Sequence, residues 1–292
     1  MCDDHSIDDM IAYGLRGPDL SRRRFGTLTF GAGLALLASR VASAREMSSS
    51  EVDITTPDGT ADAYFVHPAT GKYPGVLIWP DAGGLRPAFK LMAHRLAEDG
   101  YSVLVPNPFY RTGKGPVLPP GADMQDEAVR KKMMAAMGSL NPATHVTDAR
   151  AFVGYLDSQP SVDRKRKMGT TGYCMGGPIT MRTAATFPDR IGAGASFHGG
   201  GLVTDRADSP HLLVPKLKAQ YLIAIAENDD LRQPEAKTVL REAFDKAMVP
   251  AEIEVYAGTM HGWCPPDTAV YNEAQAEKAW ARLQVLFGKA LV

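Results

Sequence analysis

A glycine-flanked cysteine constrains the fold of this chain more than any other feature. The segment Gly172-Tyr173-Cys174-Met175-Gly176 lies between an apolar, strand-like run and a helix-like run. Glycines two residues before and after the cysteine are typical of a nucleophile elbow, because the sharp strand-to-helix turn strains the backbone and brings neighbouring chain too close for side chains. The pattern predicts that Cys174 is a nucleophile raised above a sheet. The alternative is a buried, inert cysteine at a tight turn.

The helix expected after the elbow begins near Met175. Its positive dipole end and free amides would lie beside the Cys174 sulfur, where they favour the thiolate and can bind a developing oxyanion. The backbone amide of Met175 is therefore a candidate oxyanion-hole donor.

An acid and a base follow the elbow in the order that α/β-hydrolases use, which is nucleophile, acid, histidine. His261 comes directly after the alternating pattern 251–256, and two adjacent aspartates follow the apolar run 221–226. We favour Asp230 as the acid, with Asp229 capping the turn or the next helix. Taken singly, such an aspartate is usually a cap and such a histidine usually a surface or core residue. Their order behind the elbow favours a triad.

At these residues the chain resembles the dienelactone hydrolase family of the α/β-hydrolase superfamily. The resemblance extends from about residue 51 to the C-terminus, and it implies a thiol-based hydrolase of esters or lactones. Four segments carry it: the elbow at Cys174, the Asp-x-x-x-Pro spacing from Asp230 to Pro234, the His-Gly-aromatic segment at His261, and the block 76–111.

The resemblance also implies roles for residues around the triad. Asp81 stands where the family commonly has a thiol-modulating glutamate, and the amide of Ala82 or Gly83 would complete the oxyanion hole with Met175. Family members that cleave lactones hold the substrate carboxylate with arginines, but the matching position after His261 is a proline. Further candidates for the substrate pocket are Tyr110, Arg111, Arg130, His198 and Trp263. For Arg130 the alternative is a solvated helix face, and for His198 it is a turn histidine.

The expected reaction is hydrolysis through a thioester. His261, oriented by Asp230, activates Cys174, the thiolate attacks an ester or lactone carbonyl, and water delivered by His261 releases the product. This chemistry requires no metal or organic cofactor. Two alternatives remain: an acyltransferase or peptidase of the same superfamily, and a non-catalytic binding protein on the same fold.

The N-terminus predicts the protein's destination. A twin-arginine pattern, Ser21-Arg22-Arg23-Arg24-Phe25, precedes an apolar run over 26–39 and a small-residue cleavage site at Ala42-Ser43-Ala44. Residues 1–44 are therefore predicted to be a signal peptide, read by the twin-arginine export machinery and leading to the periplasm or beyond. The apolar run is shorter than the ~20 residues that cross a bilayer. A basic leader or a short membrane anchor is the alternative.

Residues 45–292 are expected to form one hydrolase domain, because 45% of the chain's 292 residues are hydrophobic. The net charge of -1 gives no electrostatic case for nucleic acid, so the expected partner is a small ester or lactone, with the protein a monomer or small homo-oligomer.

After a hairpin over 52–66, apolar runs alternate with helix-like segments, which predicts an α/β-hydrolase fold with a mostly parallel sheet covered on both faces. Strands are expected near 76–79, 102–105, 169–173, 193–197, 221–226 and 253–256, and helices near 88–98, 126–138, 147–158, 178–186, 235–246 and 272–287.

Overall fold

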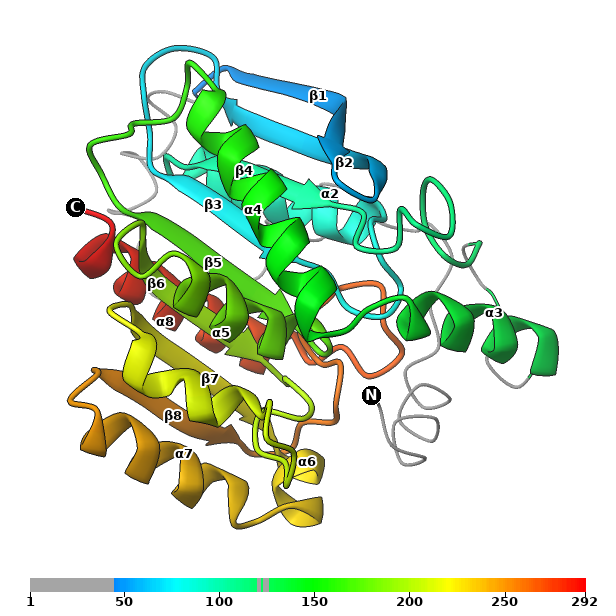
Figure 1. Ribbon diagram of the computed structural model, residues 1–292, viewed down its shortest axis with the longest axis vertical. Coiled ribbons are helices and arrows are strands. Elements are labelled where there is room, and N and C mark those ends of the chain that lie inside the picture. The colour runs from blue at the N-terminus through cyan, green and yellow to red at the C-terminus, as the bar shows by residue number, and fades with distance from the viewer. Residues whose placement is uncertain (1–44, 120–121, 123–125) are drawn as a thin grey trace, which may run out of the picture.

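The computed structural model describes residues 45–119, 122 and 126–292 (Figure 1). The predicted signal peptide, residues 1–44, lies outside the described residues.

One eight-stranded sheet organises the described chain, in the order β1-β2-β4-β3-β5-β6-β7-β8. The hairpin strands β1 and β2 are antiparallel to each other, β2 is antiparallel to β4, and all other neighbours are parallel. The strands are β1 (Met47–Thr56), β2 (Gly59–Pro68), β3 (Gly75–Trp79), β4 (Ser102–Pro106), β5 (Met168–Tyr173), β6 (Ile191–Phe197), β7 (Gln220–Ala226) and β8 (Ala251–Tyr256).

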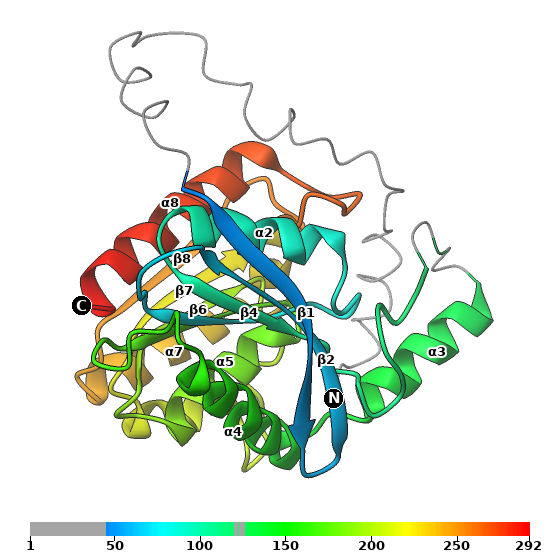
Figure 2. The ribbon, with the colours of Figure 1, turned by 90° about the horizontal axis from the view of Figure 1, so that it is seen from above.

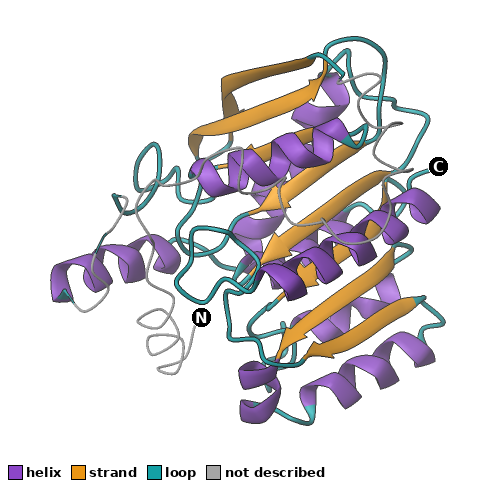
Figure 3. Cartoon of the chain, turned by 180° about the vertical axis from the view of Figure 1, so that it is seen from behind, coloured by secondary structure: helices purple, strands orange, loops and turns teal. Residues whose placement is uncertain are grey.

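Helices cover both faces of this sheet (Figures 1 and 3). Helices α2 and α8 bury one face with side chains such as Phe89 and Phe287, and α4, α5 and α7 bury the other with side chains such as Phe152 and Phe244. Helix α3 projects from one end of the molecule (Figure 2). The helices are α2 (Pro87–Glu98), α3 (Glu127–Gly138), α4 (Pro142–Ser158), α5 (Gly176–Thr186), the 3-10 helix η1 (Pro210–Lys216), α6 (Glu227–Arg232), α7 (Ala236–Lys246) and α8 (Glu273–Ala290).

The predicted α/β-hydrolase fold is confirmed, and each predicted strand and helix is present. Helix α4 begins earlier than predicted, because Asn141 caps it in a capping box with Thr144. The six-residue helix α6 is not among the predicted helices, since its sequence Glu-Asn-Asp-Asp-Leu-Arg has no apolar face to reveal a helical period.

The parallel strands place the predicted site residues at one edge of the sheet. Asp81 follows β3, Cys174 follows β5, His198 follows β6 and His261 follows β8, while α6 follows β7. Because parallel strands end at the same edge, these positions converge although they are far apart in sequence.

Candidate active site

The turn at Cys174 has the geometry of a strained elbow. Cys174 has φ 55°, a left-handed conformation that residues other than glycine rarely adopt. A Cβ added at Gly172 would lie 2.2 Å from the carbonyl oxygen of Gly176, and one added at Gly176 would lie 2.4 Å from that of Trp79. Both flanking glycines are therefore required by the close approach of backbone, as the sequence predicts.

Helix α5 starts immediately after the nucleophile candidate. Met175 is its N-cap and Gly176 its first residue, so the amino end of the helix lies beside the Cys174 side chain, which is half-buried. This end of a helix attracts negative charge, because its first amides have no partner within the helix.

Asp229, and not Asp230, contacts the histidine. Nδ1 of His261 lies 2.8 Å from Oδ2 of Asp229. The expectation for Asp230 is corrected by the structure: both of its carboxylate oxygens accept hydrogen bonds from Lys237, at 2.8 and 2.6 Å. The two aspartates lie in the helical turn of α6, where consecutive side chains point in directions about 100° apart, so only one of them can face His261.

Helix α6 also forms hydrogen bonds with the loop that carries His261. The amide of His261 donates to Oδ1 of Asn228 at 2.7 Å, and the amide of Gly258 donates to Glu227 at 3.1 Å. In the other direction, the amide of Glu227 donates to the hydroxyl of Thr259 at 3.2 Å. These contacts fix the imidazole relative to the end of β7.

His261 is held between an acid and the sulfur. Burial on its own lowers the pKa of His261, but the charge of a Cys174 thiolate, the hydrogen bond to Asp229 and a hydrogen bond to Cys174 together raise this pKa well above its ordinary value of 6.5. A cationic imidazolium beside the sulfur stabilises a thiolate. His261 is therefore placed to hold a proton beside the Cys174 sulfur.

The two residues predicted to supply oxyanion-hole amides lie close together. Ala82 is buried in an apolar cluster against which Met175 packs, so the two predicted donors lie in one neighbourhood. The amide of Gly83, the alternative to Ala82, donates to Oδ1 of Asp81 at 2.8 Å and is thereby occupied. The structure thus favours Ala82 over Gly83 for this role.

Asp81 belongs to a buried ion cluster that the sequence analysis missed. Its two carboxylate oxygens accept hydrogen bonds from Arg86 at 2.5 and 2.9 Å, and the same guanidinium donates to both oxygens of Asp267 at 2.6 and 2.9 Å. Arg86 is 4% exposed, and Asp81 is completely buried. Burial raises the pKa of Asp81, opposed by the charge of Arg86 and its hydrogen bonds. The cluster connects the loop between β3 and α2 to the loop that follows His261.

Tyr110 and Arg111, predicted to line the substrate pocket, contribute their polar groups to a different network. The Tyr110 hydroxyl donates to Asp148 of α4 at 2.8 Å and accepts from Thr56. Arg111 donates to Asp148 at 2.7 and 2.9 Å and is also paired with Asp58. The structure therefore gives Arg111 carboxylate partners within the protein. Arg130 lies half-buried on α3.

His198 and Trp263 lie in the interior near His261. Both are completely buried, and the His198 ring lies 5.1 Å from that of His261 and 5.3 Å from that of Trp263, both edge to face. Trp263 in turn stacks on Tyr256 at 5.2 Å. His198 thus lies in the bend that follows β6, and its ring packs against that of His261.

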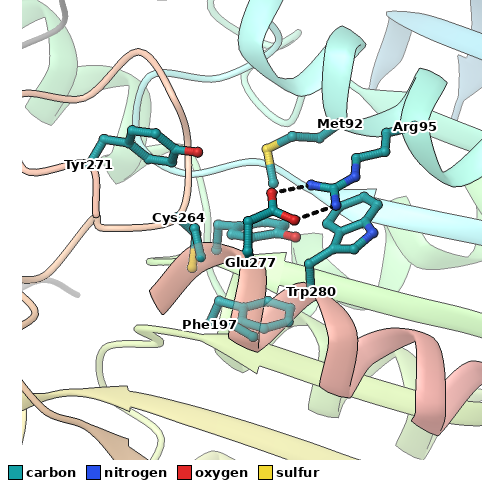
Figure 4. A pocket seen from close by; sticks show the side chains of 10 residues that line it. Met92, Arg95, Phe197, Cys264, Tyr271, Glu277 and Trp280 are labelled. Carbon is teal, nitrogen blue, oxygen red and sulfur yellow. Dashed lines mark hydrogen bonds and ion pairs between the residues drawn. The ribbon is translucent and has the colours of Figure 1, made fainter. Parts of the chain in front are cut away.

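The second cysteine of the described chain lies apart from the nucleophile candidate. Cys174 and Cys264 are both free thiols. Burial raises the pKa of Cys264 well above its ordinary value, so this thiol stays protonated. Cys264 lines a cavity of about 20 Å³ between α2 and α8, room for a single water molecule, whose rim carries the ion pair of Arg95 and Glu277 (Figure 4). This cavity is too small for a substrate, and Cys174 does not line it.

The described residues hold neither a candidate metal cluster nor a candidate membrane span. No group of three or more His, Cys, Asp or Glu side chains there is arranged to hold a metal ion. Within the same residues, no helix combines the length and apolar character needed to cross a bilayer.

A parallel sheet with helices on both faces, an elbow after β5 and a histidine after β8 define the class of α/β-hydrolases. Within that class, the chain belongs to the dienelactone hydrolase family, whose sequence model matches residues 61–291. The expectation of a hydrolase of the ester and lactone class is confirmed.

Individual relatives agree with this assignment. A protein of Methylorubrum extorquens named "Putative carboxymethylenebutenolidase" is 28% identical over 280 residues, which cover 92% of each chain. A solved structure from Klebsiella pneumoniae, described as a "Putative Dienelactone Hydrolase", is similar with a TM-score of 0.70 and 22% identity, covering 84% of this chain and 99% of the other. A dienelactone hydrolase-like promiscuous phosphotriesterase from metagenomic libraries is similar with a TM-score of 0.67, 23% identity and the same coverage. These two structures show the shared fold.

Proposed function

We propose that this chain is a thiol-dependent hydrolase of uncharged carboxylic esters and lactones, with Cys174 as nucleophile, His261 as base and Asp229 as the orienting acid. One observation carries the proposal: the imidazole of His261 is held between the Asp229 carboxylate and the sulfur of a cysteine in an elbow conformation. Nucleophile, base and orienting group in contact are the signature of covalent acyl transfer.

The proposed reaction starts from a Cys174 thiolate beside protonated His261. The thiolate attacks the carbonyl carbon, and the amides of Ala82 and Met175 stabilise the tetrahedral oxyanion. The carbon–oxygen bond then breaks, and His261 gives its proton to the leaving alkoxide. Neutral His261 next takes a proton from water, the hydroxide attacks the thioester, and the thiolate leaves as the acid product forms. Asp229 keeps Nε2 of His261 directed toward the sulfur in both half-reactions, by binding Nδ1.

Uncharged substrates are proposed because cations that could bind a substrate carboxylate already have acidic partners. Arg86 is bonded to Asp81 and Asp267, and Arg111 to Asp58 and Asp148. The position after His261 that carries an arginine in lactone-cleaving relatives is Pro265. The cluster around Ala82 is apolar, with members including Phe109, Val117, Leu118 and Met133. Such surroundings favour a neutral acyl group over an anionic one.

The test is hydrolysis of short-chain p-nitrophenyl esters by residues 45–292 under reducing conditions, beside Cys174→Ala and His261→Ala. We expect kcat/KM to fall by at least about 10³-fold in each variant. Cys264→Ala is the matched control, since it removes the other thiol of the domain, and it should keep wild-type kcat. Equal turnover in wild type and Cys174→Ala would remove the thiol mechanism.

A second assay tests the substrate class. The wild-type protein should cleave a neutral lactone with a higher kcat/KM than a carboxylated dienelactone of similar size. The reverse preference would contradict the charge argument while leaving the nucleophile assignment intact.

We further propose that residues 1–44 direct export by the twin-arginine route. The Arg22-Arg23 pair and the small residues at 42–44 support this, and β1 begins at Met47, so cleavage after Ala44 leaves every described strand and helix intact. Replacing both arginines by lysine in a bacterial host should move the protein from the periplasmic to the cytoplasmic fraction. An unchanged distribution would contradict this route.

A further inference from the structure

His198 occupies an unusual position beneath the elbow. It follows β6 directly, its side chain is completely buried, and its φ is 40°, in the left-handed region. Its amide donates to the carbonyl of Ala224 in the neighbouring strand β7 at 2.8 Å, which holds the backbone in place. A non-glycine residue with positive φ in the interior is held in that conformation by its surroundings.

The imidazole of His198 contacts both reacting residues. Its Nδ1 accepts a hydrogen bond from the backbone N–H of Cys174 at 3.1 Å. The same N–H also donates to the carbonyl of Phe197 at 3.1 Å. The ring edge meets the ring of His261 with 5.1 Å between centroids. One side chain thus connects the backbone of the nucleophile to the ring of the base.

These contacts define the chemical state of His198. An imidazole nitrogen that accepts a hydrogen bond carries no proton, so the proton of the neutral ring is on Nε2. Nε2 is buried and has no hydrogen-bond partner among the described residues, an arrangement that costs about 1–3 kcal/mol. Complete burial lowers the pKa of His198 well below 6.5, and the neighbouring His261 lowers it further. The ring therefore stays neutral beside the cationic His261.

We infer that His198 is a positioning residue that sets the distance and direction between the Cys174 sulfur and His261. A strained backbone and an unsatisfied buried N–H both destabilise the fold, and both occur at the one side chain that connects nucleophile and base. The inference rests on the proposed function, because it assigns His198 a role in that reaction. His198 does not touch the reacting atoms in this account; it acts through the Cys174 backbone and the His261 ring.

The first experiment uses the unmodified wild-type chain. Nitrogen-15 NMR of histidine-labelled protein at pH 7 should show that the imidazole signal lost in a His198→Asn variant has an unprotonated Nδ1 and a protonated Nε2. A cationic ring, or a proton on Nδ1, would overturn the inference. This result does not depend on catalysis.

The second experiment compares two substitutions. His198→Phe keeps an aromatic ring against His261 and Trp263 but removes the acceptor, whereas His198→Asn supplies an acceptor oxygen and tolerates a positive φ. We expect kcat for a p-nitrophenyl ester to fall about 10- to 100-fold in His198→Phe with KM within about threefold, since small misplacements of reacting groups have effects of this size. His198→Asn should recover a substantial part of that loss. His94→Phe, at a half-buried histidine of α2 paired with Glu98, controls for loss of a histidine and should keep wild-type kcat.

Wild-type kcat in His198→Phe, or an equal loss in both variants, would overturn the positioning role. If His198→Phe does not fold, judged by near-ultraviolet circular dichroism, the NMR tautomer decides. A different result would contradict the proposed function itself: turnover by Cys174→Ala equal to that of wild type.

Discussion

Asp229 and Asp230 are neighbours in sequence but contact different partners. Asp229 binds Nδ1 of His261, and Asp230 is paired with Lys237 of α7. The sequence placed an acid in this segment but favoured Asp230, because the orientation of the two side chains depends on a helical turn of six residues that has no sequence period. The same limit hid Asn228, whose side chain holds the amide of His261.

The two aspartates form a matched pair for mutagenesis. Asp229→Asn should lower kcat by about 10²- to 10⁴-fold, because His261 loses its orienting carboxylate, whereas Asp230→Asn should stay within about threefold of wild type. The pKa of His261 should fall in Asp229→Asn, since the carboxylate and its hydrogen bond raise it. Histidine NMR titration and ester kinetics measure both effects. An equal loss in both variants would contradict the assignment of Asp229.

The elbow was the best-predicted element, because its geometry depends on residues next to each other. Glycine at 172 and 176 follows from steric contact within one turn, and the structure shows those contacts. The strands β3, β4 and β5 were also predictable from local sequence. They are buried along their whole lengths, and strands buried on both faces read as short apolar runs. The ion pair between Arg86 and Asp267 was not predictable. It joins residues 181 positions apart, and no local pattern around either residue indicates the other as its partner.

Alanine at the elbow glycines tests this geometry. Gly176→Ala should destabilise the fold by at least about 2 kcal/mol, because the new Cβ meets the backbone carbonyl of Trp79 at 2.4 Å and backbone cannot move aside cheaply. Gly154→Ala in α4 is the control: its Cβ would meet nothing within 4 Å, and alanine should stabilise the helix by about 0.5–1 kcal/mol. Urea unfolding measures both. A Gly176→Ala variant as stable as wild type would refute the close approach.

The buried ion cluster gives a second prediction about how elements are joined. Arg86→Met leaves Asp81 and Asp267 without their shared cation and should lower the free energy of unfolding by about 3–5 kcal/mol. Lys114→Met breaks an exposed ion pair with Asp53 and should change the free energy of unfolding by less than about 1 kcal/mol. If chemical denaturation gives similar values for the two variants, Arg86 does not connect these loops in the way described.

The sheet as a whole brings the site together, since six parallel strands of the described chain end at one edge and carry residues from five separate parts of the chain to it. This arrangement also places two histidines with opposite pKa shifts in contact. The pKa of His261 is raised in the folded protein, so its contribution to stability is complete below pH 6.5 and is lost as pH rises through the folded pKa. The pKa of His198 is lowered, so the unfolded chain gains a proton below pH 6.5 that the folded chain does not, and stability falls as pH drops.

This sign argument predicts the effect of one variant on the entire stability curve. Just below pH 6.5, the free energy of unfolding of wild type should decline more steeply with falling pH than that of His198→Asn, by up to about 1.4 kcal/mol per pH unit. Urea titrations between pH 7 and pH 5 supply the two slopes. Parallel curves would show that His198 titrates in the folded protein as it does in the unfolded chain.

The most direct measurement is a search for the covalent intermediate. Wild-type protein mixed with excess p-nitrophenyl acetate, quenched in acid within the first turnovers and digested, should carry one acetyl group on the peptide containing Cys174, and hydroxylamine should remove it. Cys174→Ala should carry none, and Cys264→Ala should be labelled as wild type is. Turnover without an acyl group on Cys174, or an acyl group on another residue that persists in Cys174→Ala, would contradict the thioester mechanism.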